Sequence, residues 1–194
     1  MRPVLVVIGG LPATGKSTVA AALAAQTGAP YVRVDRIEQA IVAWSALVHP
    51  VGPVGYAVAH QLALEQLQLD LDVIVECVNP VAVTRDAWRE TAHAAGAAAV
   101  EIEVICSDEV EHRRRAESRE SDVDGLAKPT WAEITAREHE PWSRTVVRVD
   151  SATTTVAAAV ERITAAVATA RHLADHDPQT VRPSSPGPSS SVPD

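Results

Sequence analysis

The stretch with the clearest chemical signature runs from Gly10 to Ser17, GLPATGKS, and fills every fixed position of the phosphate-binding pattern G-x-x-x-x-G-K-[ST]. Glycines let the backbone curve around an anion because no Cβ stands in the way, and the N–H groups of such a loop attract phosphate. Lys16 supplies a compact positive charge for β- and γ-phosphates, and the Ser17 hydroxyl is placed to ligate Mg²⁺. The motif therefore predicts a site for a nucleoside triphosphate and Mg²⁺.

Two carboxylates follow other apolar, strand-like runs. Asp35 comes after residues 31–34, where it could accept the proton of a substrate hydroxyl held in line with the γ-phosphate. The alternative is that Asp35 only caps the helix that begins next to it. Glu76 ends the apolar run 73–76, where an acid can hold Mg²⁺ or orient the attacking group. We predict Glu76 as a metal residue with Ser17, and whether it contacts metal or substrate stays open.

Arginines are concentrated in residues 111–119, EHRRRAESR. Arg115 and Arg119 are four residues apart, so on a helix they share a face, and two like charges in that position are favourable only beside an anion. We expect both to bind ATP phosphates and to form the catalytic set with Lys16 and Asp35. A charged helix that is merely solvated is the alternative. The residues expected to bind the nucleotide are Gly10, Leu11, Pro12, Ala13, Thr14, Gly15, Lys16, Ser17, Thr18 and Arg115.

The other arginines of this helix have two possible uses. One of Arg113 and Arg114 could stack on the adenine, while the rest pair with Glu111 and Glu117. The adjoining residues 121–129 contain turn formers and few apolar side chains, so we expect a lid at about 120–130 that closes over the phosphates.

Three further polar residues follow predicted strands. Asn79 with Pro80 is expected to cap and begin a helix, a substrate contact being the alternative. Arg85 either clamps an anionic substrate or lies on a solvated face. Asp150 ends the last strand, and the loop after it either borders the base of the nucleotide or is only a turn.

Apolar runs and helical stripes alternate along the chain. Strands are expected at 4–8, 31–34, 73–76, 100–105 and 146–149, and helices at 19–25, 37–47, 56–69, 80–95, 108–120, from 130, and 155–170. Ser107 is expected to cap the fifth of these helices. This alternation predicts an α/β fold of the P-loop NTPase type, a three-layer sandwich whose five-stranded parallel sheet has helices on both faces and a small lid.

Composition limits the classes of protein that fit. At 194 residues one domain, 1–173, is expected, followed by a disordered Pro/Ser-rich tail at 174–194. A net charge of −8 disfavours binding to nucleic acid, and no apolar run is long enough for a membrane span. The two cysteines, Cys77 and Cys106, are expected to be buried and reduced in a cytoplasmic protein. The four tryptophans are expected to pack in the interior.

The chain resembles the P-loop small-molecule kinases, a group that includes chloramphenicol phosphotransferase, gluconate kinase, zeta toxins and the kinase part of polynucleotide kinase. It is most similar to bacterial proteins of the AAA-like ATP-binding group. The resemblance covers residues 4 to about 170 and depends on GLPATGKST, VRVDRIE, IVECVNPVAVTRDAW, CSDEVEHRRRAESR and VRVDS. It implies that Lys16 and Ser17 hold phosphate and Mg²⁺, that Asp35 is the catalytic or substrate-orienting acid, and that Arg115 and Arg119 bind phosphate from the lid side.

These features predict an ATP- and Mg²⁺-dependent kinase that phosphorylates a hydroxyl of a small metabolite, acting as a monomer or homodimer. The acceptor would lie between Asp35, residues 52–60 and Asn79. The alternatives are a nucleotide-gated ATPase or binding protein without an acceptor, a polynucleotide 5′-hydroxyl kinase, and a kinase like the zeta toxins. The sequence does not distinguish ATP from GTP.

Overall fold

A computed structural model describes residues 1–118, 125 and 128–176 of the chain. Arg119, most of the predicted lid and residues 177–194 of the predicted tail lie outside the described residues. The strands are β1 (Val4–Gly9), β2 (Tyr31–Arg33), β3 (Val73–Glu76), β4 (Ala98–Ile105) and β5 (Val147–Asp150). The helices are α1 (Lys16–Thr27), α2 (Val34–Ala43), α3 (Val54–Gln68), α4 (Ala82–Ala94), α5 (Glu109–Ser118), α6 (Trp131–Thr135) and α7 (Val156–Asp175).

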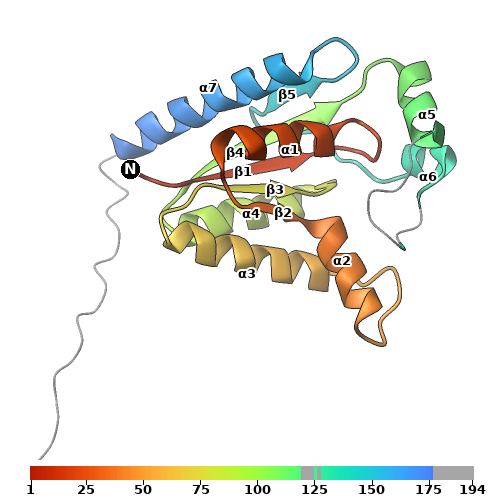
Figure 1. Ribbon diagram of the computed structural model, residues 1–194, viewed down its shortest axis with the longest axis horizontal. Helices are drawn as coiled ribbons and strands as arrows, with labels where there is room; N and C mark the ends of the chain where they lie inside the picture. The colour runs from red at the N-terminus through yellow and green to blue at the C-terminus, as the bar shows by residue number, and fades with distance from the viewer. Residues whose placement is uncertain (119–124, 126–127, 177–194) are drawn as a thin grey trace, which may run out of the picture.

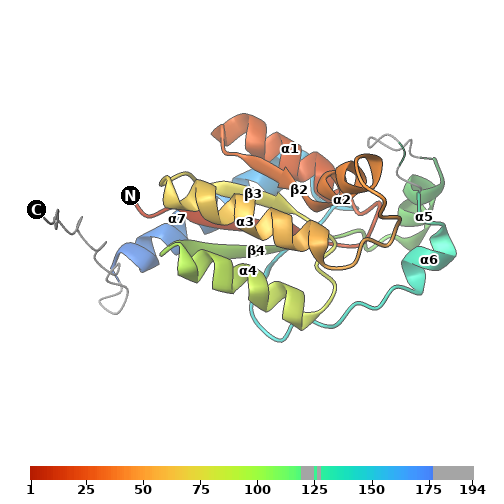
Figure 2. The same ribbon diagram turned by 90° about the horizontal axis from the view of Figure 1, so that it is seen from below.

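The five strands form one sheet in the order β2-β3-β1-β4-β5, and every pairing in it is parallel. Helices α1 and α7 cover one face, and α3 and α4 cover the other (Figures 1 and 2). All six residues of β1 are buried because this central strand has helices on both faces. The predicted α/β P-loop fold with a five-stranded parallel sheet is therefore confirmed.

Each face of the sheet has its own hydrophobic core. On one face, side chains of β1 and β4 pack with α1 and α7, and on the other face Leu5 and Val7 of β1 pack with α3 and with Trp88 of α4. Alternating residues of β1 thus enter opposite cores, which fixes the register of the strand that leads into the phosphate-binding loop.

Helices α2, α5 and α6 extend beyond the carboxyl edge of the sheet, the edge at which the β1–α1 loop lies (Figure 1). Ligands bind at this edge in open parallel sheets. A small satellite cluster of Ala13, Ala116 and Ile134 packs the α5–α6 unit against the β1–α1 loop. None of the helices in the described ranges combines the length and apolarity that a bilayer crossing requires.

Three predicted helix ends are wrong. Helix α2 covers Val34–Ala43, so it begins earlier and ends earlier than expected, and Trp44 at its end is 91% exposed rather than packed. Helix α7 continues to Asp175, two residues into the expected tail, where Arg2 donates to the carbonyl of Ala174 at 2.7 Å. Ser107 does not cap α5, because Asp108 accepts from the Glu111 N–H at 3.0 Å in its place.

Candidate functional site

The β1–α1 loop adopts a conformation that only small residues fit. Gly10 has φ +151°, and a Cβ there would lie 2.3 Å from the carbonyl oxygen of Val104. Gly15 is the N-cap of α1 with φ +91° and makes no side-chain capping bond, and the start of a helix attracts anions. Ala13 has φ +66°, a strained value for a residue with a Cβ. The loop is thus shaped as a cradle for phosphate groups, with Lys16 buried at its end.

The two predicted metal residues lie in contact. Ser17 Oγ donates to Glu76 Oε1 at 2.5 Å. The other oxygen of Glu76 accepts from the Tyr31 hydroxyl and is paired with Arg33 Nε at 3.0 Å. Glu76 is only 2% exposed, so these three partners fix the orientation of its carboxylate. A hydroxyl and a carboxylate are the hard oxygen donors that Mg²⁺ prefers, and this pair therefore fits the ion that the motif implies.

Asp35 lies in the first turn of α2, and Glu38 is one turn further on. The pKa of Glu38 is raised because the side chain is partly buried and stands beside the Asp35 charge, with Arg137 opposing the shift. Glu38 packs so closely on α3 that a Cβ at Gly55 would lie 2.3 Å from its Cγ. The glycine is therefore needed for α2 and α3 to approach each other beside this acidic pair.

The charges of Asp35 and Lys16 both shift the pKa of the buried Cys77 thiol. Cys77 is 1% exposed, and burial raises its pKa to about 12, with the charge of Lys16 opposing that shift and that of Asp35 adding to it. The hydroxyl of Tyr56, on α3, contacts the same thiol, and burial raises the pKa of this phenol. Ser17 at the start of α1 and Tyr56 of α3 both contact the segment at the end of β3, through Glu76 and Asn79 respectively. Cys77 and Cys106 are both free, as predicted, although Cys106 is only partly buried.

Arg115 reaches from α5 toward the start of α1. Its guanidinium donates to Glu111 at 2.7 Å and to Ser151 Oγ at 2.8 Å and carbonyl oxygen at 3.2 Å. A Cβ at Gly15 would lie 3.9 Å from its Nη1, so Arg115 borders the phosphate cradle. The expected partner Arg119 lies outside the described residues.

The two exposed arginines of α5 pair within the helix. Arg113 donates to Glu117 at 2.8 Å, and Arg114 donates to Glu111 at 2.6 and 2.8 Å. The predicted ion pairs are therefore confirmed. These contacts, together with those of Arg115, lower the pKa of Glu111 to about 2.

His112 was not anticipated from the sequence. It is 7% exposed, and its Nε2 bonds the carbonyl oxygen of Pro12 at 2.8 Å. A carbonyl can only accept, so this nitrogen carries the proton. The edge of the ring packs on Trp131 of α6 with centroids 5.1 Å apart. His112 thus ties the helix of Arg115 to the middle of the phosphate loop. Its i−3 spacing from Arg115 was the only sequence signal that could have pointed to it.

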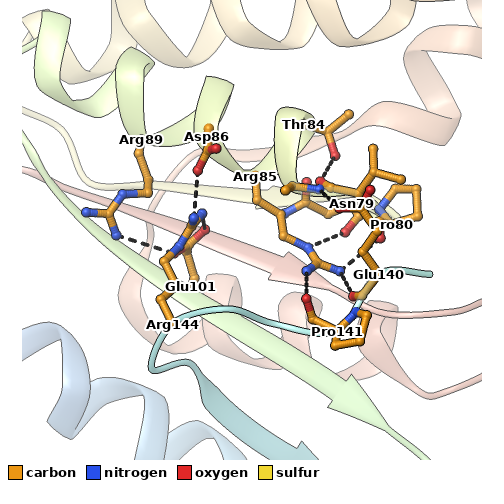
Figure 3. Close-up of polar contacts among 12 residues, drawn as sticks. Asn79, Pro80, Thr84, Arg85, Asp86, Arg89, Glu101, Glu140, Pro141 and Arg144 are labelled. Carbon is orange, nitrogen blue, oxygen red and sulfur yellow. Dashed lines mark hydrogen bonds and ion pairs between the residues drawn. The ribbon is translucent and has the colours of Figure 1, made fainter.

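Both predictions for Arg85 are wrong. The side chain is 2% exposed, and its fork donates to four backbone carbonyls, those of Asn79 (3.1 Å), Pro80 (2.9 Å), Glu140 (2.7 Å) and Pro141 (3.2 Å) (Figure 3). The guanidinium also lies over the Trp142 ring, 4.1 Å from its centroid. Four of its five N–H donors are committed to the protein, so Arg85 neither clamps a substrate nor faces solvent.

The prediction that Asn79 caps α4 is also wrong. The N-cap is Val81, and the N–H of Ala82 donates at 2.6 Å to the carboxylate of Glu140, which comes from a distant part of the chain. Asn79 stands outside the helix with φ +52°. At the end of β5, Asp150 accepts from the Ser107 N–H at 3.0 Å and from its hydroxyl at 2.5 Å, so Asp150 joins the end of β5 to the segment between β4 and α5.

These contacts assemble a phosphate cradle with an oxygen pair on one side and a cation on the other. The cradle carries Lys16 at its base, the Ser17–Glu76 pair fits Mg²⁺, and Arg115 borders Gly15. A family model described as an AAA domain matches residues 5–141 of this chain. The chain belongs to that AAA domain family. Within the described ranges no group of three or more His, Cys, Asp and Glu side chains is arranged to hold a metal ion.

Several solved structures with the same fold are named as kinases. A proposed kinase of Chloroflexus aurantiacus superposes with a TM-score of 0.69 at 20% identity, over 87% of this chain and 98% of that one. A gluconokinase of Sinorhizobium meliloti gives 0.58 at 22% identity, over 89% and 96% of the two chains. The APS kinase CysC of Mycobacterium tuberculosis, solved with AMPPNP and APS, gives 0.60 at 18% identity, over 84% and 96%. These structural neighbours establish the P-loop kinase fold of this chain. No curated protein matches the sequence.

Proposed function

We propose that this protein is an ATP- and Mg²⁺-dependent phosphotransferase that transfers the γ-phosphate to a hydroxyl of a small metabolite. The observation that carries the proposal is the Ser17–Glu76 hydrogen bond of 2.5 Å at the mouth of the phosphate loop, with Asp35 on the adjoining α2. The structural neighbours named as a gluconokinase and an APS kinase support a small-molecule acceptor.

Each residue of the cradle has a defined task in this proposal. Lys16 and the N–H groups at the start of α1 bind the phosphates, and Ser17, oriented by Glu76, holds the metal ion, which would neutralise phosphate charge when bound. Arg115 stabilises negative charge on the other side of the phosphates. Arg119 is predicted from the sequence to assist it.

Asp35 accepts the proton of the acceptor hydroxyl in this proposal, or orients that hydroxyl. The acceptor lies between α2 and α3, beside Glu38 and Tyr56, where the acidic pair and the buried phenol converge on the end of β3. That the protein acts in the cytoplasm, as a monomer or homodimer, stays a prediction from the sequence.

The test is a screen of small hydroxyl compounds for stimulation of ADP release from MgATP, with sugars, sugar acids, polyols and nucleosides as the panel. A productive acceptor should raise ADP release above the rate in water and yield a phosphorylated product. Asp35→Asn should abolish that stimulation and leave the affinity for MgAMPPNP unchanged. Steady hydrolysis that no acceptor stimulates would instead support an ATPase without an acceptor.

A further inference from the structure

The Asn79 side chain is buried without hydrogen-bond partners. It is 1% exposed, and neither its amide nitrogen nor its amide oxygen has a partner in the part of the chain that the structure describes. Buried polar atoms are normally hydrogen-bonded, because a buried amide without a partner loses its hydrogen bonds to water and gains none from the protein. A carboxamide that lacks a partner for both its donor and its acceptor therefore needs an explanation.

Asn79 lies at the junction of three parts of the proposed site. Its Cβ stands against the last residue of β1, since a Cβ at Gly9 would lie 3.2 Å from it. Its N–H donates to the hydroxyl of Tyr56 at 3.2 Å, on the α3 side. It follows Glu76 by three residues at the end of β3. The unpaired carboxamide is thus held between the start of the phosphate loop and the phenol beside the acidic pair of α2.

The backbone of Asn79 is left-handed. Its φ of +52° lies in a region that glycine adopts most readily and that asparagine adopts more often than most other residues. Arg85 bonds the carbonyl oxygens of Asn79 and Pro80, and the same guanidinium is locked by Glu140, Pro141 and the Trp142 ring (Figure 3). Arg85 therefore joins the backbone at Asn79 and Pro80 to the segment of Glu140 and Pro141. This fixed backbone carries the carboxamide that has no hydrogen-bond partner.

We propose that the Asn79 carboxamide binds a hydroxyl of the acceptor and that Arg85 is the positioning residue that holds it there. A carboxamide donates through its NH₂ and accepts through its oxygen, and a hydroxyl does the same, so one hydroxyl satisfies both halves. The burial of this side chain favours a neutral ligand group such as a hydroxyl or a water molecule over a charged one. This inference rests on the proposed function, because it names a residue of the same acceptor site.

The test compares Asn79→Gly with the wild type and with Asp70→Gly as a matched control. Glycine fits a positive φ, and Asp70 has φ +62° on the exposed α3–β3 turn at the opposite edge of the sheet. The measurements are the melting temperature, the dissociation constant for MgAMPPNP, and ADP release from MgATP with water as the acceptor.

Asn79→Gly should melt no lower than Asp70→Gly, because it removes an unsatisfied buried amide. It should bind MgAMPPNP as the wild type does, and release ADP about tenfold more slowly through loss of the hydrogen bonds that hold the attacking oxygen. A melting temperature well below that of Asp70→Gly would overturn the inference, since Asn79 would then have a structural role. An unchanged rate of ADP release would overturn it as well.

Failure of this inference is separable from failure of the proposed function. A wild-type protein that binds MgAMPPNP but releases no ADP from MgATP with water or with any acceptor of the panel contradicts the proposed function, and the melting temperatures then decide the role of Asn79 alone. For Arg85, the readout is the rate of ADP release by Arg85→Lys and Arg85→Met at saturating MgATP. The positioning role requires a partial loss in the lysine variant, which keeps the charge and some donors, and a larger loss in the methionine variant.

Discussion

Ser17 and Glu76 form a hydrogen bond between the first turn of α1 and the end of β3, with Ser17 Oγ donating to Glu76 Oε1 at 2.5 Å. The bond joins the phosphate loop to the neighbouring strand. It also places a carboxylate beside the hydroxyl that P-loop proteins use for Mg²⁺. A substitution at Glu76 should therefore affect both the stability of the end of β3 and the proposed metal site.

Glu76→Gln should weaken both the fold and the response to Mg²⁺. An amide cannot neutralise Arg33, whose side chain is 11% exposed, and breaking such a buried pair costs about 3 kcal/mol of unfolding free energy. Urea denaturation measures that loss, and MgATP titration measures the change in metal dependence. Tyr31→Phe is the control, because it removes one hydrogen bond to the same carboxylate and leaves the ion pair. Equal effects of the two variants would contradict the prediction.

His112→Leu should weaken nucleotide binding through the phosphate loop. The substitution removes the bond to the Pro12 carbonyl, worth about 1 kcal/mol, and frees α5 with Arg115 from its anchor. We expect a higher KM for ATP and a smaller change in kcat, with partial recovery in His112→Gln, which keeps a donor. The exposed His93 provides the control variant His93→Leu. A fall in kcat at unchanged KM would argue against the anchor.

Arg85→Met should cost about 3 kcal/mol or more of unfolding free energy, because it leaves four backbone carbonyls without this donor and removes the stacking on Trp142. Arg89→Met is the matched control one turn along α4, since the Arg89 side chain is 55% exposed. Chemical denaturation of both variants checks the difference. If the two lose similar stability, the four carbonyl bonds contribute little.

Glu38→Gln should raise thermal stability at neutral pH. The folded-state pKa of Glu38 lies above the unfolded value, so its contribution is greatest while the carboxyl is protonated and is lost as pH rises through the folded pKa. The variant should therefore melt higher than the wild type at about pH 8 and equally at about pH 4, below the usual glutamate pKa. Melting curves across this range test it, with the exposed Glu65→Gln as control. A gain that does not vary with pH would contradict the titration argument.

Native protein should react with a thiol reagent at Cys106 only. Cys77 is 1% exposed, and its pKa of about 12 leaves little thiolate at neutral pH. We expect one modified thiol per folded chain and two after denaturation. Rapid reaction of both thiols in the native protein would show that the end of β3 opens readily.

The sequence predicted the parts of the molecule that depend on local pattern. The motif GLPATGKS and the apolar runs before it and at residues 73–76 indicated the central strands and the position of Ser17 opposite Glu76. The helix expected from residue 130 is also confirmed, and the capping box of Thr130 and Glu133 begins it as α6. In each case the residues that interact are close in the chain or belong to a motif of fixed geometry.

What the sequence did not predict depends on contacts between distant segments. Arg85 bonds backbone carbonyls 55 and 56 residues away, and a carbonyl leaves no trace in the residue type. Asn79 followed by Pro80 is typical of a helix start, but the first N–H of α4 is bonded by Glu140 instead. His112 bonds a carbonyl 100 residues away. In all three cases tertiary contacts overrode or supplied what local propensity could not specify.

The exposure of Trp44 gives this protein a built-in optical reporter. Trp44 stands at the end of α2 with 91% of its surface in water, whereas Trp88 is 0% exposed, so their emission should differ in wavelength. A change at the long-wavelength edge of the emission spectrum would report on Trp44 and the segment between α2 and α3. A change at the short-wavelength edge would report on Trp88 and the interior. A single fluorescence titration could therefore separate motion beside the acceptor region from disturbance of the core.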